Sequence, residues 1–284
     1  MQKHLPDYLK RGIIDTDKTK NVRRILKEKC LNTVCEEARC PNKAECYSKD
    51  TATFMIMGDT CTRNCRFCNI NSGKPSELDP DEPLHVAQAV KELGLNYAVI
   101  TSVTRDDLPD GGAKHFADTI SEIKKLSPNT KVEVLIPDFK GNIKALDTVL
   151  NANPEVLNHN IETIEGLYKT VRPQAIYERS LEVLEYSKSK TITKTGIMVG
   201  LGETEKDLIK LFEDLKSINL DILTIGQYVR PSKNHLEVVK YYTPEEFDAI
   251  KNLAQNIGIK VVISAPLVRS SFKAYEAYKK VVSE

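Results

Sequence analysis

Short apolar runs rich in β-branched residues alternate with longer amphipathic stretches along most of this chain. The apolar runs predict strands over residues 51–58, 96–103, 131–138, 155–162, 191–200, 221–229 and 260–268. Helical spacing predicts helices over residues 84–94, 113–126, 178–189, 204–217 and 243–258. Thr204 and Thr243 are suited to cap the last two helices, and Pro244 to open the final one. This alternation predicts right-handed βαβ units and a parallel sheet.

The number of these units narrows the fold class. Six helix-linked units and a final strand are too few for a closed eight-fold barrel and more than a small doubly wound sheet needs. We therefore predict an α/β fold built as a partial (β/α)6 TIM-like barrel. The chemistry of such folds sits at the carboxyl ends of the strands. Polar residues that fall there can also be helix caps or solvated loop residues. They lie at positions 101–107, 158–162 and 200–203, and at Gln227 and Arg230.

Composition excludes several classes of partner. The 284 residues carry 41 basic and 40 acidic side chains, a formal net charge of +1, so no general attraction to nucleic acid or anionic membrane is expected. No apolar run reaches the roughly 18 residues of a membrane span. The chain starts with the polar sequence MQKHLPDYLKRG, and we expect a soluble, cytoplasmic protein. The basic run 18–29 (KTKNVRRILKEK) is either a solvated helix face or a docking patch for an acidic partner.

The cysteines provide the main chemical signal. Six of the seven form two triplets, spaced C-x4-C-x5-C and C-x3-C-x2-C, at Cys35, Cys40 and Cys46 and at Cys61, Cys65 and Cys68. Thiolates select zinc or iron–sulfur clusters, and both usually take four protein ligands. Each triplet therefore leaves one ligand position open. The second triplet follows the first predicted strand, at the mouth of the predicted barrel.

Disulfides, structural zinc and inert burial compete with a cluster as roles for these cysteines. Disulfides rarely persist in a reducing compartment. Structural zinc needs four ligands, usually as two close pairs, and these spacings do not form such pairs cleanly. Buried, inert cysteine is common, but it does not account for six thiols between residues 35 and 68. It does suit Cys30, which fits neither triplet. A zinc-stabilised binding module remains the non-enzymatic alternative.

The second triplet, in the segment CTRNCRFCN, resembles the radical S-adenosylmethionine superfamily. The segment around the first triplet, VCEEARCPNKAEC (34–46), resembles the lipoyl synthase family within it. Further segments resemble that family in the same order: TSVTRDDLPDGGAKHFA (101–117), LNHNIET (157–163), VRP (171–173), GIMVGLGET (196–204), GQYVRPSKNHL (226–236) and VRSSF (268–272). The resemblance implies a barrel of the radical S-adenosylmethionine type with N- and C-terminal extensions.

The resemblance also implies two [4Fe-4S] clusters. The cysteines Cys61, Cys65 and Cys68 would hold one whose open iron binds S-adenosylmethionine, the source of a 5'-deoxyadenosyl radical. The cysteines Cys35, Cys40 and Cys46 would hold an auxiliary cluster closed by Ser271, the second serine of an Arg-Ser-Ser motif. An oxygen ligand is harder than thiolate and gives the auxiliary cluster a weak point where it can open. Without the resemblance, the motif would be a polar helix start with serine as N-cap.

The implied activity is that of a sulfurtransferase. Two sulfur atoms from the auxiliary cluster would enter C6 and C8 of an octanoyl chain amide-linked to a lysine of a lipoyl carrier domain. The implied partners are octanoylated carrier domains, namely 2-oxoacid dehydrogenase E2 subunits and the glycine cleavage H protein, and an electron donor. No nucleic acid or membrane partner is expected. A biotin-synthase-like insertion of sulfur into a free small molecule is the alternative.

We expect no catalytic acid or base, because hydrogen-atom abstraction needs none. Expected contacts with S-adenosylmethionine come from Phe67, Thr101, Asp106, Asn158, Asn160, Glu203 and Gln227. Arg172 and Arg230 join the basic run as candidates for docking a carrier, and His159 is expected to be a hydrogen-bonded strand-end residue. The predicted domains are an extension over residues 1–50 with the auxiliary cysteines, the barrel over 51–264, and a C-terminal segment over 265–284.

Overall fold

A computed structural model describes residues 5–10, 16–38, 40, 42–48 and 52–283. The chain divides into two compact units. The first, here the N-terminal unit, comprises residues 12–63 and 69–157. The second, the C-terminal unit, comprises residues 1–11, 64–68 and 158–284. The predicted domains at 1–50, 51–264 and 265–284 stay a prediction.

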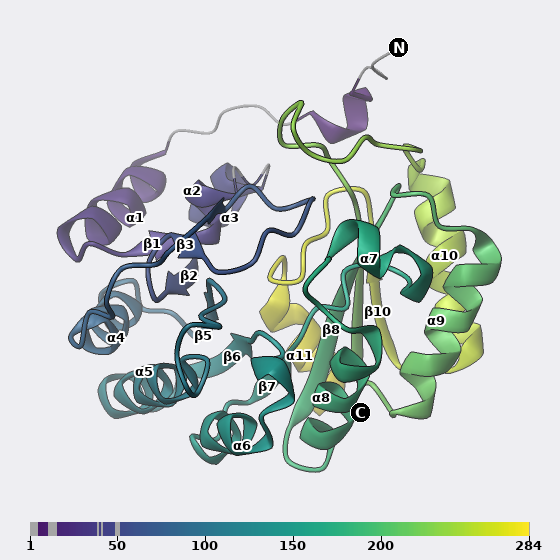
Figure 1. The fold of residues 1–284 in the computed structure, drawn as a ribbon. Coiled ribbons are helices and arrows are strands. Elements are labelled where there is room, and N and C mark those ends of the chain that lie inside the picture. The colour runs from purple at the N-terminus through teal and green to yellow at the C-terminus, as the bar shows by residue number, and fades with distance from the viewer. Residues whose placement is uncertain (1–4, 11–15, 39, 41, 49–51, 284) are drawn as a thin grey trace. The chain divides into compact units, whose positions relative to one another are not determined.

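In the N-terminal unit, parallel strands are covered by helices. Its main strands follow the order β1-β2-β5-β6-β7, where β2, β5 and β6 pair in parallel and β1 is antiparallel to β2. Their bounds are β1 Asn32–Thr33, β2 Thr53–Ile56, β5 Tyr97–Ser102, β6 Lys131–Leu135 and β7 Val156–Asn158. A separate short pair consists of β3 Thr60–Cys61 and β4 Asn71–Ser72. The helices are α1 Asp17–Glu28, α2 Val34–Glu37, α3 Lys43–Ser48, α4 Glu82–Glu92, α5 Ala113–Leu126, the 3₁₀ helix η2 Phe139–Gly141 and α6 Ile143–Asn151. Helices α4, α5 and α6 lie side by side in Figure 1.

The C-terminal unit repeats this arrangement with three parallel strands. Strand β9 Ile222–Gln227 lies between β8 Ile192–Val199 and β10 Val261–Ser264. The helices are η1 Asp7–Leu9, η3 Glu165–Leu167, α7 Tyr168–Val171, α8 Tyr177–Lys188, α9 Glu205–Ser217, α10 Pro244–Ile257 and α11 Ala274–Val282. Apolar side chains of α9, including Leu211 and Phe212, pack with residues of β9 and α10 in one buried cluster. The burial of this apolar face stabilises the strand–helix packing.

Every predicted strand and helix overlaps an observed one, although the limits differ. The strand predicted over residues 155–162 is wrong in length, because β7 ends at Asn158. Glu162 has φ +70, a left-handed conformation that interrupts extended backbone, and it makes only an isolated bridge to Ile197. Thr51, where the first predicted strand begins, lies outside the described residues.

Helix α6 was not predicted, although the sequence carries its signal. Asn142 caps it by accepting a hydrogen bond from the Ala145 amide. Leu146, Val149 and Leu150 then follow at helical spacing and are buried. The basic run 18–29 is also helical: Val22 and Ile25 face inward on α1.

The predicted caps are confirmed. Thr204 and Thr243 each form a capping box at the start of α9 and α10. We expect Thr243→Ala to lower the free energy of unfolding by about 1 kcal/mol, because the Glu246 amide loses its acceptor. Urea unfolding of the anaerobically purified protein measures this loss. Thr243→Ser keeps the oxygen and is the control; equal destabilisation by both substitutions would contradict the cap.

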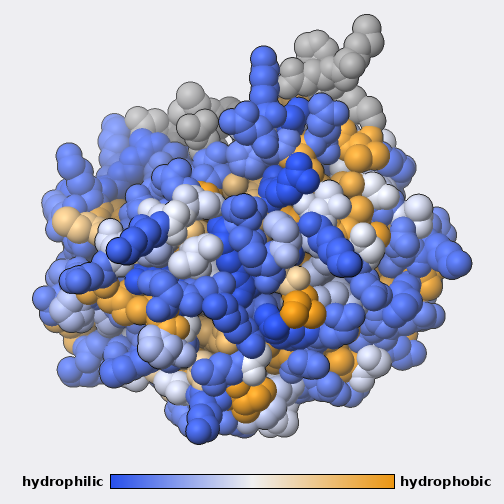
Figure 2. All heavy atoms as spheres, in the orientation of Figure 1, coloured by the Kyte–Doolittle hydropathy of each residue, from blue (hydrophilic) through white to orange (hydrophobic). Residues whose placement is uncertain are grey.

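Polar residues cover most of one face of the molecule (Figure 2). Figure 2 shows a largely hydrophilic face with small, separated hydrophobic areas. No helix in the described part of the chain is long and apolar enough to cross a membrane. On α1, Arg24 forms ion pairs with Glu28 and Glu92, and Lys29 forms one with Glu92. These pairs offset part of the positive charge of the basic run.

Candidate functional site

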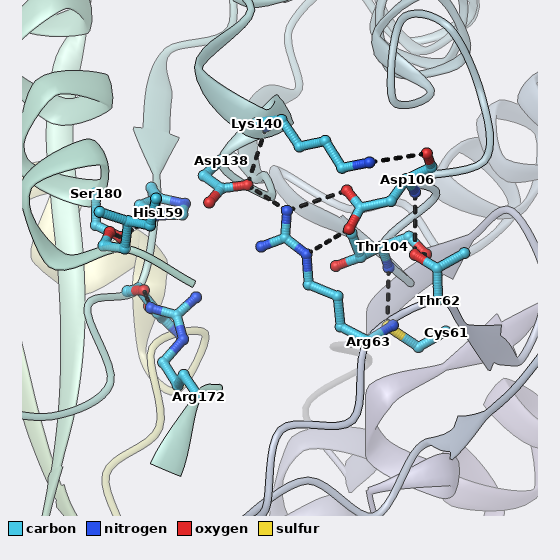
Figure 3. Close-up of polar contacts among 12 residues, drawn as sticks. Cys61, Thr62, Arg63, Thr104, Asp106, Asp138, Lys140, His159, Arg172 and Ser180 are labelled. Atoms are coloured by element: carbon cyan, nitrogen blue, oxygen red, sulfur yellow. Dashed lines mark hydrogen bonds and ion pairs between the residues drawn. The ribbon is translucent and has the colours of Figure 1, made fainter. Parts of the chain in front are cut away.

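Cys61 lies in a network of backbone hydrogen bonds. Its Sγ accepts hydrogen bonds from the amides of Arg63 at 3.4 Å and Thr104 at 3.3 Å. The amide and hydroxyl of Thr62 both donate to the Thr104 carbonyl, at 3.0 and 2.9 Å. Figure 3 shows these groups together in the N-terminal unit. Two amides directed at one sulfur are hydrogen-bond donors of the kind that surround metal-bound sulfur ligands.

The side chain of Arg63, the second residue after Cys61 in this loop, is fixed by two carboxylates. Its Nε and Nη2 donate to the two oxygens of Asp106 at 2.7 and 3.0 Å, and Nη2 also reaches Asp138 Oδ1 at 2.6 Å (Figure 3). Burial lowers the pKa of Arg63, but the hydrogen bonds and charges of the two carboxylates outweigh burial and leave that pKa raised. The guanidinium therefore stays charged. The sequence analysis names Asp106 only as an expected cofactor contact and gives no role to Arg63 or Asp138.

In the C-terminal unit, hydrogen bonds fix the segment 64–68, which carries the other two cysteines of the second triplet. The Arg66 amide donates to the Val171 carbonyl at 2.9 Å, and the Arg66 carbonyl accepts from the Leu236 amide at 3.3 Å. His235 Nε2 lies 2.9 Å from the Cys68 carbonyl, and His235 Nδ1 lies 2.8 Å from Ser232 Oγ. Because a carbonyl only accepts, Nε2 carries a hydrogen here and the Ser232 hydroxyl can donate to Nδ1.

The expected cofactor contact Phe67 lies in this same segment. Its ring packs against a buried apolar cluster of Val171, Leu201 and Tyr228. His235 belongs to the segment GQYVRPSKNHL, but no role was predicted for it. Its partner, Cys68, lies 167 positions away.

The first triplet lies on two short helices and the turn between them, in the N-terminal unit. Cys35 is buried in α2, Cys46 is in α3, and the Cys40 amide donates to the Cys35 carbonyl at 3.2 Å. Burial raises the pKa of the Cys35 thiol to about 12. A hydrogen bond from the Thr53 amide lowers this pKa, but its effect is smaller than that of burial. A cluster bound here would take Cys35 as thiolate, so its assembly would release a proton.

The structure pairs none of the seven cysteines in a disulfide. Among the residues whose side chains are described, no three of His, Cys, Asp and Glu surround a point that one metal ion could occupy. A [4Fe-4S] cluster binds each thiolate to a different iron, so its ligands stand further apart than those of one ion. The donor set, three thiols in each triplet, fits such clusters chemically.

Two of the expected cofactor contacts, Glu203 and Gln227, bond to the backbone. The Glu203 carboxylate accepts from the amides of residues 200–202 at 2.6, 3.0 and 3.1 Å. Gln227 is fully buried and donates to three backbone carbonyls at 3.0 to 3.1 Å, while its oxygen accepts from the Tyr242 amide at 2.9 Å. Both side chains therefore shape the loops after β8 and β9.

Of the remaining expected contacts described next, Thr101 and Asn158 are buried at strand ends, and Asn160 is half-buried just after β7. Thr101 on β5 donates to the Leu135 carbonyl at 3.0 Å in the N-terminal unit. Asn158 is fully buried. In the C-terminal unit, Asn160 Nδ2 donates to Glu162 at 3.0 Å and to Ser270 Oγ at 3.2 Å. Among the described residues, the buried Asn160 Oδ1 has no hydrogen-bond partner, which makes it an acceptor available to a ligand.

Around Asn160, one carboxylate and two arginines are held inside the C-terminal unit. Burial raises the pKa of the Glu162 carboxyl, and the charges of Arg172 and Arg269 with a hydrogen bond from Asn160 oppose that rise. Arg172 is buried and donates to the Asn160 and Ile161 carbonyls at 2.8 and 3.1 Å. A guanidinium held in this way is poorly placed to dock a carrier, contrary to our expectation for Arg172.

Arg230 and His159 complete the predicted residues of this unit. Arg230, the second docking candidate, is half-buried and pairs with Glu237 at 3.4 Å. His159 is buried and bonds Ser180 Oγ at 3.1 Å, which confirms it as a hydrogen-bonded strand-end residue (Figure 3).

The segment 269–272 precedes α11 without capping it. Helix α11 begins at Ala274, and its N-cap is Lys273, in a left-handed conformation with no side-chain cap bond. The interpretation of the Arg-Ser-Ser motif as a helix start capped by serine is therefore wrong. Ser270 accepts from Asn160, while Ser271 is half-buried.

The chain matches known proteins over most of its length. The model of the radical SAM superfamily matches residues 55–215. A lipoyl synthase of Caldicellulosiruptor saccharolyticus is 53% identical over 282 residues, covering 98% of this chain and 99% of that protein. One from Caldicellulosiruptor bescii is 57% identical and covers 95% of this chain and 94% of that protein. Among solved structures, Streptococcus suis SuiB bound to S-adenosylmethionine superposes with a TM-score of 0.59 at 10% identity, covering 80% of this chain and 55% of that chain. That likeness concerns the fold alone, and it confirms the partial barrel.

Proposed function

We infer the function of this chain from its family: it belongs to the lipoyl synthase family of the radical S-adenosylmethionine superfamily. It inserts two sulfur atoms, at C6 and C8, into an octanoyl chain that is amide-linked to a lysine of a lipoyl carrier domain. Its cofactors are S-adenosylmethionine and two [4Fe-4S] clusters. The observation that carries this function is the identity of more than half of all aligned positions over nearly the whole of both chains.

We propose that each cysteine triplet holds one cluster. Cys61, Cys65 and Cys68 are the ligands of the cluster that binds S-adenosylmethionine, and they lie on one stretch of eight residues. Cys35, Cys40 and Cys46 hold the auxiliary cluster, the sulfur donor, with Ser271 as fourth ligand. The clusters supply the electron that cleaves S-adenosylmethionine and the sulfide that enters the substrate.

The protein's own groups orient these ligands. The amides of Arg63 and Thr104 direct hydrogen bonds at Cys61, and His235 fixes the Cys68 carbonyl. Ser271 is free of any capping role, which supports its assignment as a ligand. We propose no catalytic acid or base, because the substrate carbon loses a hydrogen atom and not a proton.

The proposed contacts with S-adenosylmethionine differ in their support. Asn160 has the best, because its buried Oδ1 lacks a partner. Glu203 and Gln227 act by fixing the loops after β8 and β9. The same proposal includes Phe67, Thr101, Asp106 and Asn158.

The proposed partners follow from the substrate. They are 2-oxoacid dehydrogenase E2 subunits, the glycine cleavage H protein and an electron donor. Oxygen-sensitive clusters call for a reducing compartment, and we propose the cytoplasm.

Turnover of an octanoyl-lysyl peptide tests this function. The anaerobically reconstituted protein should contain about eight irons and as many labile sulfides per chain. It should also convert the peptide, with two 5'-deoxyadenosines formed for each lipoyl group. Octanoic acid is the control substrate. Reaction of the free acid in place of the peptide would favour the biotin-synthase-like alternative, and about four irons or fewer would contradict two clusters.

A further inference from the structure

Residues 61–63 are joined to residues 104–106 within the N-terminal unit. Besides its two bonds to the Thr104 carbonyl, Thr62 accepts at Oγ1 from the Asp106 amide at 3.0 Å. The carbonyls of Cys61 and Arg63 are also occupied, by the Gly73 amide and the Ser72 hydroxyl, both at 3.0 Å. The first residues of the cluster loop therefore have a defined conformation in the protein chain itself.

Arg63 connects this joined segment to a second strand end. Its side chain is 4% exposed, that of Asp138 is 0% exposed, and Asp106 is 19% exposed. Asp106 follows β5 and Asp138 follows β6. The planar guanidinium presents several donors in a fixed fork, so it can reach both carboxylates at once, which a lysine ammonium could not do with the same geometry.

The backbone after Asp138 is strained in a way that orients its carboxylate. Phe139 and Lys140 have φ +44 and +53, conformations that cost free energy in residues with a side chain. The Lys140 amide donates to Asp138 Oδ1 at 3.1 Å, and its ammonium donates to the Asp106 carbonyl at 3.2 Å. The turn thus aims Asp138 at Arg63 and holds Asp106 as well.

We propose that Arg63 is a positioning residue for the cluster that binds S-adenosylmethionine. Held by Asp106 and Asp138, it keeps the amides of Arg63 and Thr104 directed at the Cys61 sulfur and so raises the reduction potential of that cluster. Hydrogen bonds to the sulfurs are one of the determinants of such potentials, because they offset the negative charge added on reduction. This inference rests on the proposed function only in taking Cys61 as a cluster ligand.

Potentiometric titration followed by electron paramagnetic resonance tests the proposal in the reconstituted enzyme. Arg63→Met and Asp138→Asn should both shift the midpoint to more negative potential. Asp138→Asn is decisive, because removal of a negative charge by itself would shift the midpoint to more positive potential. A positive shift in Asp138→Asn would overturn the proposal. Tyr97→Phe, which removes a buried hydrogen bond to Glu133 at the opposite end of β5, should leave the midpoint unchanged.

Hydrogen exchange in the cluster-free protein gives a second readout. The amides of Arg63 and Thr104 should exchange at least about tenfold faster in Asp138→Asn than in the wild type, because their orientation is no longer fixed. Unchanged exchange at both amides would also overturn the proposal. If Arg63→Met does not fold, Arg63→Lys and the isosteric Asp138→Asn keep the test intact. A wild type that binds no cluster at Cys61 would refute the proposed function, whereas the exchange result would remain interpretable.

Discussion

Cys65→Ala should reduce formation of 5'-deoxyadenosine and of lipoyl product to background. Two remaining thiolates do not hold a four-iron cluster that must also bind S-adenosylmethionine, so iron should fall from about eight to about four per chain. The fold should persist, because the bonds that fix the segment 64–68 run through Arg66 and the Cys68 carbonyl, neither of which changes. Iron analysis and chromatography of the single-turnover products measure both effects.

The mirror variant, Cys40→Ala, separates the roles of the two triplets. It should also retain about four irons, yet it should still form 5'-deoxyadenosine while the lipoyl product disappears. Cys30→Ala is the matched control, since this exposed cysteine belongs to neither triplet, and it should behave as the wild type. Loss of deoxyadenosine in Cys40→Ala and its survival in Cys65→Ala would reverse the assignment of the clusters.

Ser271→Ala should leave the cluster that binds S-adenosylmethionine intact and abolish sulfur insertion. The alanine has no oxygen to complete the auxiliary cluster, so deoxyadenosine should form without lipoyl product. Ser271→Cys offers a thiolate in place of the oxygen; it should retain about eight irons but transfer sulfur slowly, because a softer ligand leaves iron less readily. Mössbauer spectroscopy and single-turnover product analysis would distinguish the two variants.

Ser270→Ala is the control for the motif. It removes an acceptor of Asn160, a hydrogen bond worth about 1 kcal/mol. We expect partial loss of sulfur insertion with the full iron content retained. If Ser270→Ala and Ser271→Ala exchange these outcomes, the first serine is the ligand. Formation of lipoyl product at the wild-type rate by Ser271→Ala would show that Ser271 is not a ligand of the auxiliary cluster and that the cluster does not open there.

The sequence predicted those parts of the fold that local pattern determines. β-Branched runs mark all seven predicted strands, because a strand buried on both faces needs apolar residues at successive positions. The end of β7 differs from the prediction, because the composition of residues 155–162 does not reveal the left-handed backbone at Glu162. Helix α6 was missed despite its Asn142 cap, because it is short and follows the irregular turn after β6.

In the candidate site, too, the sequence predicted the features that depend on local spacing and not those that depend on distant residues. Both triplets could be recognised because the spacing of their thiols is local. Arg63 could not be assigned, because its partners lie 43 and 75 positions away. The strand-end residues Glu203 and Gln227 were found, but sequence alone does not tell a side chain that contacts a ligand from one that satisfies buried backbone groups.

Gly226 on β9 leaves the space in which the backbone before the Arg-Ser-Ser motif lies. A Cβ added there would lie 2.0 Å from the Val268 carbonyl oxygen and 3.1 Å from Nη1 of Arg269, so the strand has space for a hydrogen atom but not for a methyl group. The Arg-Ser-Ser segment rests directly on this bare stretch of backbone. Gly226 has no reactive side chain, yet its replacement by alanine would displace the segment that carries Ser271.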